Sequence, residues 1–495
     1  MKKRIQKKKI KLFFLFIEIL IILLTAALVP LNIFVCNFPE WFVIIFGITA
    51  ITVSIFYVLK FRVRIVSRII NIALTACISI LSVLAAYAVP YWNSYSLKKY
   101  NGKILGYDDV ITYTQAENDI DEAMKLLKRI HPMFKDGLTD EIASRCEQSK
   151  EKLKNSDEIN VNDLRRELQS IINPMHDAHT TTYNSYPNDR YLRSAPQKSY
   201  EKYELISFND MTIDEAKAKA KAYFSYESES WIKVDFGSLA SLDFYNFSEP
   251  YIYEWDNGSG EIVREECCES DFVPYDEYVK ICSEFDEEVL SEKPFVYYEI
   301  DEEKNLAILT LSKCIYDKQY IKCIEDMFNE IKEKNIGNVA VDLRNNGGGN
   351  SLVANEFIKY LPVDEYKGSS NDWRFNFITL HSDDENTNKH YSDLTFTGDV
   401  YVITNSSSFS SAMLFSMYIQ DNKLGSIIGE SPANSANSYG DIAIFNLKET
   451  GLTMSISTKK FKRANSANPS DYIIPDFPCD SKDALETLYS IISQQ

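Results

Sequence analysis

The chain has little of what zinc centres, disulfide scaffolds and nucleotide-binding loops require. Its nine cysteines include the adjacent Cys267 and Cys268, and they lack the paired spacing of a zinc site or a disulfide framework. The one run of glycines has neither the Gly-Lys-Ser/Thr ending of a P-loop nor GxGxxG spacing. No internal repeat is visible. We therefore expect no metal and no repeat architecture.

Positive charge is scarce after the first 100 residues. Those residues carry 13 lysines or arginines and two acidic residues, whereas the rest of the chain carries 40 basic and 69 acidic residues. A strongly acidic globular part repels phosphate backbones. We therefore do not expect a nucleic-acid partner.

Three long apolar runs occupy the basic N-terminal part, at Leu12–Cys36, Trp41–Leu59 and Ile69–Trp92. Each is close to or above the roughly 20 residues that cross a bilayer as a helix. A cleaved signal peptide would show only one such run. One run could instead be a buried core helix, but the lengths and the sorting of charge favour three transmembrane helices.

The basic residues are distributed as the positive-inside rule requires. One cluster, residues 2–11, precedes the first run and another, residues 60–68, separates the second run from the third, while the connector 37–40 has no basic residue. Both clusters belong on the cytoplasmic side. Three crossings then place everything after Tyr91 outside the cell membrane, with residues 12–92 in contact with lipid.

Beyond this anchor the pattern becomes mixed. Apolar residues recur at helical spacing over Ile120–Ile130, and a second helix is predicted at Val161–Ile172 with Asn160 as its N-cap. Residues 200–300 combine short strand-like runs with turns, which is typical of a small α+β insert.

From Phe295 onwards, short apolar strands alternate with amphipathic helices. The predicted strands are Leu306–Leu311, Val339–Leu343, Val400–Thr404 and Ser426–Ile428, and the predicted helices are Tyr320–Lys334, Leu352–Leu361 and Ser411–Gln420. This alternation favours an α/β core around a largely buried sheet. The polar run His381–Asp393 is interpreted as a surface loop.

Two of the predicted strands end in segments that can carry chemistry. The run Asp342–Gly349 closes on three glycines, whose uncovered N–H groups can stabilise a negatively charged oxygen, although a phosphate loop or a plain turn would look alike. The run Thr404–Ala412 places serines between a strand and a helix. That position suits a nucleophile, although such serines ordinarily cap helices.

A third segment, His176–Thr180, supplies a candidate base. The chain has only five histidines, and a side chain that takes a proton from serine should titrate near neutrality. His179 is therefore the natural candidate, although a histidine at the head of a Thr-rich strand is more often structural.

Together these segments resemble the motifs of the tail-specific, or carboxyl-terminal processing, serine peptidases. Asp342–Gly349 is similar to their glycine motif, Phe409–Ala412 to their nucleophile motif, and His176–Thr180 to their N-terminal segment. Further residues in matching order are Asp421, Gly429 with Glu430, and Pro475 with Asp476. The resemblance implies Ser410 as the nucleophile.

The same resemblance implies an oxyanion hole formed by the N–H groups of Ser411 and of Gly348 or Gly349. Such a site needs neither a metal nor an organic cofactor.

The base follows from a departure within the family. Bacterial processing proteases use a lysine in the turn that matches residues 431–438, and this chain has none there. The chain is therefore nearer the histidine-using branch, which includes the tricorn core protease. That branch implies His179 as the base and Asp471 as the acid that orients it. Lys459 and Lys460 are the remaining lysine candidates.

The implied fold is a crotonase-like (ClpP/crotonase) α/β catalytic core with a helical N-terminal segment and a small insert, behind three transmembrane helices. No PDZ-type peptide-binding motif is evident in the insert. The predicted domains are a membrane anchor (1–92), a linker (93–107), a helical segment with the histidine motif (108–184), an α+β insert (185–294) and the peptidase core (295–495).

We therefore expect a membrane-anchored serine endopeptidase that hydrolyses proteins or peptides outside the cell membrane. The alternative is a non-catalytic ligand-binding, peptide-binding or sensing module on the same fold. It is motivated by the missing lysine and by Met413, which replaces the usual glutamate three residues after the nucleophile. An acyl-CoA enzyme is disfavoured by the predicted location.

Overall fold

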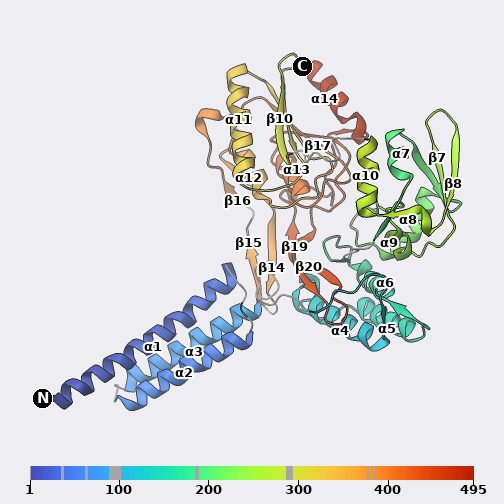
Figure 1. The fold of residues 1–495 in the computed structure, drawn as a ribbon. Helices are drawn as coiled ribbons and strands as arrows, with labels where there is room; N and C mark the ends of the chain where they lie inside the picture. The colour runs from blue at the N-terminus through green and yellow to red at the C-terminus, as the bar shows by residue number, and fades with distance from the viewer. Residues whose placement is uncertain are drawn as a thin grey trace.

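The computed structural model describes residues 2–34, 38, 40–61, 65–88, 102–183, 189–285, 294–375, 378–383 and 385–494. Figure 1 shows an N-terminal bundle of long helices, a smaller helical segment, a small mixed domain and a larger α/β part that contains the C-terminus.

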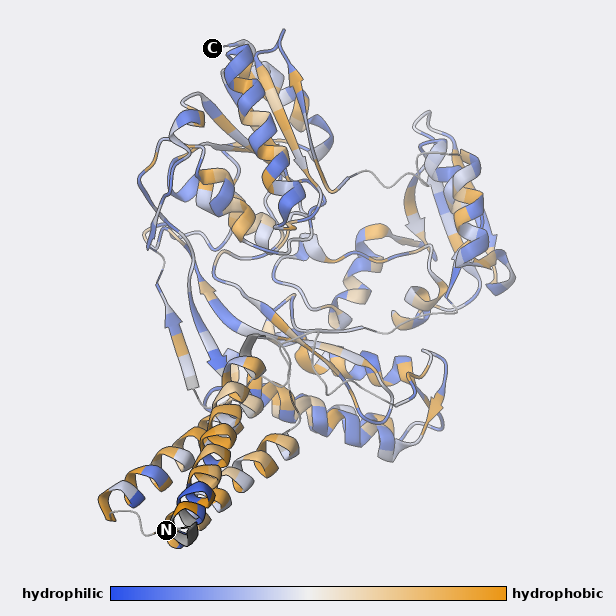
Figure 2. Cartoon of the chain, turned by 60° about the vertical axis from the view of Figure 1, so that its left-hand side comes forward, coloured by the Kyte–Doolittle hydropathy of each residue, from blue (hydrophilic) through white to orange (hydrophobic). Residues whose placement is uncertain are grey.

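The N-terminal bundle consists of α1 (Lys2–Phe34), α2 (Glu40–Lys60) and α3 (Ile65–Ala88). All three helices are long and apolar enough to span a membrane, and Figure 2 shows them coloured predominantly as hydrophobic residues. Polar groups lie inside the bundle, where Ser54 of α2 donates to Glu18 of α1 at 3.0 Å. The predicted spans agree with these helices, except that Cys36 and residues 89–92 lie outside the described residues.

The α/β part is built on a six-stranded sheet in which the first pair is antiparallel and the other neighbours are parallel. In spatial order its strands are β10 (Val296–Asp301), β11 (Leu306–Leu311), β12 (Asn338–Asp342), β17 (Asp399–Thr404), β18 (Ser426–Gly429) and β21 (Phe477–Pro478). Its helices are α11 (Lys318–Lys334), α12 (Leu352–Ile358), α13 (Ser411–Asp421) and α14 (Ala484–Ser493).

Both faces of this sheet are covered because successive strand residues point to opposite sides. In β12, Val339 and Val341 pack in the core shared with α11, α12 and α13, whereas Ala340 packs with α14. In β17, Val402 and Ile403 divide in the same way. The predicted strands and helices of this region are all present, with ends that differ by a few residues.

A second sheet carries the histidine segment. Its strands, in spatial order, are β15 (Ile378–Ser382), β14 (Ser370–Phe375), β20 (Thr453–Lys462) and β19 (Tyr439–Asn446), and β3 (Thr181–Tyr183) pairs with β20. The elements packed nearby include β1 (Val110–Ile111), β2 (Ile159–Asn160), α4 (Tyr113–Ile130), α5 (Asp140–Lys154) and α6 (Val161–Ile172). Apolar residues of α4 and α6 share one core with β19 and β20.

The predicted helix Val161–Ile172 is confirmed with both of its ends. Asn160 caps it by accepting from the N–H of Asp163 at 2.8 Å, and Asp163 returns a bond to the Asn160 N–H in a capping box. Pro174 ends the helix, after which the chain turns through His176 and enters β3.

The insert forms a separate small core. Its strands are β4 (Arg190–Leu192), β5 (Glu204–Phe208), β6 (Met211–Thr212), β7 (Tyr251–Asp256), β8 (Ile262–Cys267) and β9 (Phe272–Pro274). Its helices are α7 (Ala195–Tyr200), α8 (Ile213–Ala220), α9 (Leu239–Phe244) and α10 (Tyr275–Phe285). The described part of this region thus contains both strands and helices, and its extent as an insert over residues 185–294 stays a prediction.

The prediction of a loop at His381–Asp393 is wrong in part. His381 belongs to β15, and residues 385–387 form β16 (Glu385–Thr387), which pairs with β13 (Glu365–Lys367). The run is polar because these strands lie near the surface, so an apolar alternation that would have revealed them is absent.

Candidate active site

Ser410 stands at the junction between β17 and α13 in a strained backbone conformation. Its φ is 55° and its ψ is −117°, a combination that non-glycine residues rarely adopt. The side-chain oxygen of Asn434 accepts from the Ser410 N–H at 2.9 Å and holds this conformation. A serine presented on a tight turn between a strand and a helix is the arrangement expected of a nucleophile.

The glycine run after β12 packs directly against this serine. A Cβ at Gly348 would lie 2.6 Å from the Ser410 Cβ and 2.9 Å from the Ser411 nitrogen, and a Cβ at Gly349 would lie 2.4 Å from the Cys314 carbonyl oxygen. Both glycines also have positive φ, 95° and 137°. Only glycine therefore fits at these two positions.

The backbone donors near Ser410 are not equivalent. The N–H of Gly348 donates to the side-chain oxygen of Asn346 at 2.8 Å and is already used. Within the described part of the chain, the N–H groups of Ser411 and Gly349 donate no hydrogen bond. The Ser411 hydroxyl connects the two segments by donating to the Gly349 carbonyl at 2.8 Å. Of the predicted oxyanion donors, Ser411 and Gly349 are available and Gly348 is not.

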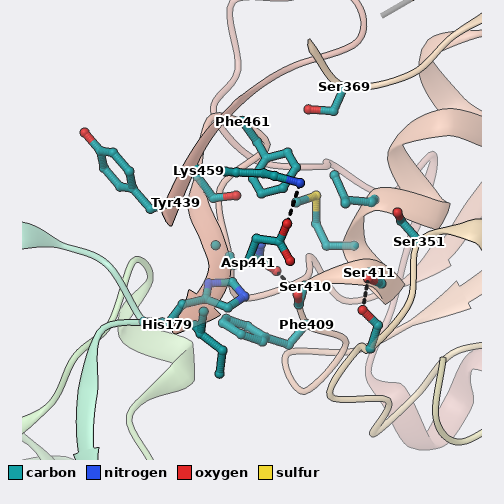
Figure 3. A pocket seen from close by; sticks show the side chains of 18 of the residues that line it. His179, Ser351, Ser369, Phe409, Ser410, Ser411, Tyr439, Asp441, Lys459 and Phe461 are labelled. Atoms are coloured by element: carbon teal, nitrogen blue, oxygen red, sulfur yellow. Dashed lines mark hydrogen bonds and ion pairs between the residues drawn. The ribbon is translucent and has the colours of Figure 1, made fainter. Parts of the chain in front are cut away.

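His179 and Ser410 line the same cavity, whose volume is about 500 Å³. Figure 3 shows the His179 ring and the Ser410 side chain facing this space. The His179 ring packs 4.5 Å, centroid to centroid, from the ring of Phe409. The sequence-predicted nucleophile and base thus come together from segments about 230 residues apart.

Chain packing explains how His179 reaches this position. The Ser455 hydroxyl of β20 donates to the His179 carbonyl at 2.6 Å, and Thr181 pairs with Ser455 in the sheet. Both ring nitrogens of His179 are buried without a hydrogen-bond partner among the described residues. Burial lowers the pKa of His179, and the charges of Asp177 and Asp441 partly oppose that effect, so the neutral ring that a base requires is favoured.

Asp177 holds the histidine segment in place through hydrogen bonds. Its carboxylate accepts from the His131 Nε2 at 2.9 Å, from the Thr180 hydroxyl at 2.5 Å and from the His179 N–H at 2.9 Å. Burial alone would raise the pKa of Asp177, but the bond and charge of His131 outweigh it and lower the pKa to about 2. Asp177 is therefore an ionised anchor for the turn that carries His179.

Asp471, predicted as the acid that orients His179, is not brought to it. Its carboxylate accepts from the Asn437 side chain at 3.0 Å, its carbonyl accepts from the Ala436 N–H at 2.7 Å, and it does not line the cavity. The Asp471 carbonyl also accepts from the Ser435 hydroxyl at 3.1 Å, so Asp471 holds the 431–438 turn.

The two lysine candidates, Lys459 and Lys460, lie in different surroundings. Lys459 lines the cavity and forms an ion pair with Asp441, as Figure 3 shows. Lys460, the next residue on β20, lies over the Tyr439 ring at 5.7 Å and is not part of the cavity lining. Because successive strand residues face opposite sides, only Lys459 competes with His179 as a base.

The insert contributes groups that sequence reasoning did not identify. The Trp231 ring stacks on Phe409 with centroids 4.2 Å apart and lines the cavity, and Lys233 bonds to the Ser407 hydroxyl. Glu227 accepts from the Ser435 N–H at 2.5 Å. These residues lie in a polar stretch without any motif, so no sequence signal pointed to them.

One group of possible metal ligands occurs among the described residues. Oxygen atoms of Asp177 and Glu227 and a ring nitrogen of His179 lie within 4.8 Å of one another. Both carboxylate oxygens of Asp177 already accept hydrogen bonds. A metal at this position would have to compete with these hydrogen bonds of Asp177.

Other motif residues have structural roles. Asp421, at the end of α13, pairs with Arg463 at 2.7 Å, and both side chains are buried. Glu430 accepts from the N–H groups of Ser406 and Ser481, both at 3.0 Å, and Asp476 accepts from the Ile427 N–H at 2.8 Å. These bonds fix the loops around the Ser410 turn.

Comparisons with known proteins agree with this geometry. Residues 305–479 match the model of peptidase family S41. Mature CPAF is similar with a TM-score of 0.53 and 12% identity over 77% of this chain and 96% of that chain, and mature CPAF complexed with lactacystin is similar with a TM-score of 0.52 and 12% identity over 77% and 97%. These two likenesses show a shared mixed α/β fold.

The photosystem II D1 C-terminal processing protease is a further solved structure with some similarity, at a TM-score of 0.43 and 10% identity over 76% of this chain and 97% of that one. No curated protein matches the chain. The matched segment contains the β12 glycine run, the Ser410 turn and Lys459. Residues 305–479 of this chain therefore match peptidase family S41, the family of tail-specific proteases, and this match supports a serine peptidase.

Proposed function

We propose that this chain is a membrane-anchored endopeptidase that hydrolyses proteins or peptides outside the cell membrane, with Ser410 as nucleophile and His179 as base. The observation that carries the proposal is the strained backbone of Ser410, held against Gly348 and facing the cavity that His179 lines. Strain of this kind costs on the order of 1–3 kcal/mol and clusters at functional sites. A binding module has no need of it.

The chemistry follows from the positions of the groups. The Ser410 hydroxyl oxygen attacks the peptide carbonyl carbon while its proton passes to His179, and the carbonyl electron pair moves onto the oxygen. The N–H groups of Ser411 and Gly349 donate to this oxyanion. Collapse breaks the C–N bond, the leaving amine takes the proton from His179, and water then releases the acyl group by the same steps in the second half.

The surroundings of the site support a peptide as substrate. The cavity is lined by aromatic and small polar side chains, and the Ser410 turn stands at the end of a buried sheet in the way a crotonase-like core would present it. The three apolar helices and the positive clusters beside them support an anchored, outward-facing chain.

The proposal is tested by hydrolysis of a fluorogenic peptide library with the full chain in detergent. Ser410→Ala and His179→Ala should each abolish turnover, and the double variant should be scarcely worse than either, because groups that act as one unit are not additive.

Two neighbouring lysine variants, one inside and one outside the cavity lining, are compared as test and control. Lys459→Ala disturbs the Asp441 ion pair and should reduce turnover modestly, whereas Lys460→Ala should leave it unchanged. Near-normal turnover in His179→Ala together with loss in Lys459→Ala would transfer the role of base to Lys459. If Ser410→Ala and His179→Ala both match a wild type without activity, the ligand-binding alternative is favoured.

A further inference from the structure

The His179 ring has no hydrogen-bond partner among the described residues that would fix its orientation. The described carboxylates near it differ in whether they have an oxygen left to accept such a bond. Its Nε2 edge faces β19, since a Cβ at Gly440 would lie 3.6 Å from both Nε2 and Cε1. Its Nδ1 edge faces Asp177, whose nearer oxygen is 3.9 Å away. A partner that leaves Nε2 free for Ser410 must therefore bind Nδ1.

Three of these carboxylates are already engaged elsewhere. Asp177 uses Oδ1 for the His179 N–H and Oδ2 for His131 and Thr180. Asp441 is paired with Lys459, and Asp471 is bonded to Asn437 outside the cavity.

Glu227 is the carboxylate with an unused oxygen at the right place. Its Oε2 accepts from the Ser435 N–H, while Oε1 is buried without a partner among the described residues. A carboxylate oxygen of Glu227 lies within 4.8 Å of a ring nitrogen of His179. Glu227 therefore has one buried oxygen without a partner, and its carboxylate lies near a ring of His179 whose two nitrogens also lack one. Buried polar atoms of this kind are costly to leave unpaired.

We propose that Glu227 is the positioning residue of this peptidase: its Oε1 accepts the Nδ1–H of His179 and leaves Nε2 free to take the proton from Ser410. The inference rests on the proposed function. One ligand atom of each side chain already lies within 4.8 Å of the other. The hydrogen bond would fix the ring orientation and the tautomer that a base requires.

Glu227 comes from the insert, and this location has a regulatory consequence. The residue lies between α8 and α9, in the insert, and not in the matched family segment 305–479. Trp231 and Lys233 dock the same stretch on the Ser410 turn through Phe409 and Ser407. The site is therefore complete only when the insert is docked.

The pH dependence has a definite sign. Burial, together with the charge of Asp177, raises the pKa of Glu227 well above its usual range, and burial lowers that of His179, so the two groups share one proton as the pH falls. The active form has Glu227 ionised and His179 neutral. A negatively charged Glu227 favours proton uptake by the pair. Removing that charge therefore lowers the pKa of this uptake, and the acid limb of the pH–rate profile moves to lower pH.

The other groups facing this pair are unchanged by such a substitution. They are Asp177 and His131 from the helical segment, Asp441 and Lys459 from the second sheet, and Tyr472, whose hydroxyl donates to the Glu227 carbonyl.

The test compares Glu227→Gln with Glu229→Gln in the full chain. Gln is isosteric and keeps an oxygen for the Ser435 N–H, and Glu229 is an exposed neighbour paired with Lys221. We expect Glu227→Gln to lower kcat by about 10²-fold, the lower end of what a positioned general base contributes, with KM little changed and the acid limb at lower pH. Glu229→Gln should match the wild type in both respects.

The results distinguish a failure of the proposed function from a failure of the role assigned to Glu227. If Ser410→Ala keeps its activity, the proposed function itself fails. If Ser410 and His179 are essential but Glu227→Gln folds and shows an unchanged kcat and acid limb, Glu227 is only structural and the inference is overturned.

A second measurement covers the case in which Glu227→Gln does not fold. In the wild-type chain labelled with ¹⁵N-histidine, a downfield Nδ1–H proton assigned by its loss in His179→Ala supports a carboxylate partner. Its absence, with His179 as the other tautomer, overturns the inference.

Discussion

At the scale of single residues, the closest backbone approach in the site lies where Gly348 meets Ser410. Gly348→Ala would drive its Cβ to 2.6 Å from the Ser410 Cβ and would impose a positive φ on alanine. We expect a loss of turnover on the order of 10²–10³, the usual effect of a displaced oxyanion site. Peptide hydrolysis by a variant shown to be folded by its melting temperature checks this.

The matched control is the adjacent glycine. A Cβ at Gly347 meets no atom within 4 Å, so Gly347→Ala should retain near-normal turnover. Equal losses in the two variants would show that the loop acts through its general flexibility and not through the contact with Ser410.

Asp177 provides a pH-dependent prediction at the same scale. Its folded-state pKa of about 2 lies below the ordinary value, so its contribution is fully present above about pH 4 and is lost as the pH falls towards 2. Asp177→Asn should therefore destabilise the chain by about 2 kcal/mol at neutral pH, and the difference from wild type should shrink below pH 4. Chemical unfolding of both proteins at pH 7 and pH 3 measures it, and a constant difference would contradict the assignment.

The residues of the site were predictable where a motif carried them and not elsewhere. Ser410, His179 and the glycine run stand next to strands in patterns that resemble a family, so sequence alone pointed to them. The position of Asp471 before the Pro-Asp pair predicts an orienting acid, but its carboxylate bonds to Asn437 and does not line the cavity. Glu227 lies in a polar stretch of the insert, and only tertiary packing brings it to the histidine.

At the scale of elements, the end of α13 is joined to the residue directly after β20 by the buried pair of Asp421 and Arg463. Both side chains are only 2% exposed, and Arg463 also donates to the carbonyls of Ser470 and Tyr472. Removing one partner leaves a buried charge uncompensated, so Asp421→Ala should cost about 3–5 kcal/mol of unfolding free energy. Urea unfolding followed by tryptophan fluorescence measures it.

An exposed pair on α11 is the control for this prediction. Lys322 and Asp326 are 2.9 Å apart but largely in solvent, and Asp326→Ala should cost less than about 1 kcal/mol. If the two variants lose similar amounts of stability, the buried pair does not hold the end of α13 to the residue after β20.

The elements themselves were predictable in proportion to their apolar pattern. The buried strands β11, β12, β17 and β18 and the helices between them have continuous or periodic apolar residues, and their positions were found from sequence. The hairpin of β14 and β15 mixes exposed and half-buried side chains with the buried Arg374, so its polar pattern predicts a loop for part of it. Its pairing with β20 is a long-range contact that no local pattern encodes.

At the scale of the whole molecule, the location of the peptidase part is a prediction that rests on the basic clusters at residues 2–11 and 60–68. In sealed membrane vesicles of known orientation, added protease should digest the part after residue 102 only when the outer face is exposed. A matched variant tests the cause: adding lysines to the connector 37–40 should disturb this orientation. Protection of the catalytic part on the outer face would refute the topology.

The central claim is that Ser410 is a nucleophile activated by His179, and labelling of the full chain with a fluorophosphonate probe tests it most directly. The probe forms a covalent bond to an activated serine and does not depend on knowing the substrate. The account predicts labelling of the wild type at a peptide containing Ser410, none in Ser410→Ala, and strongly slowed labelling in His179→Ala. A wild type that is folded but unlabelled, or a Ser410→Ala variant labelled as strongly as the wild type, would contradict it.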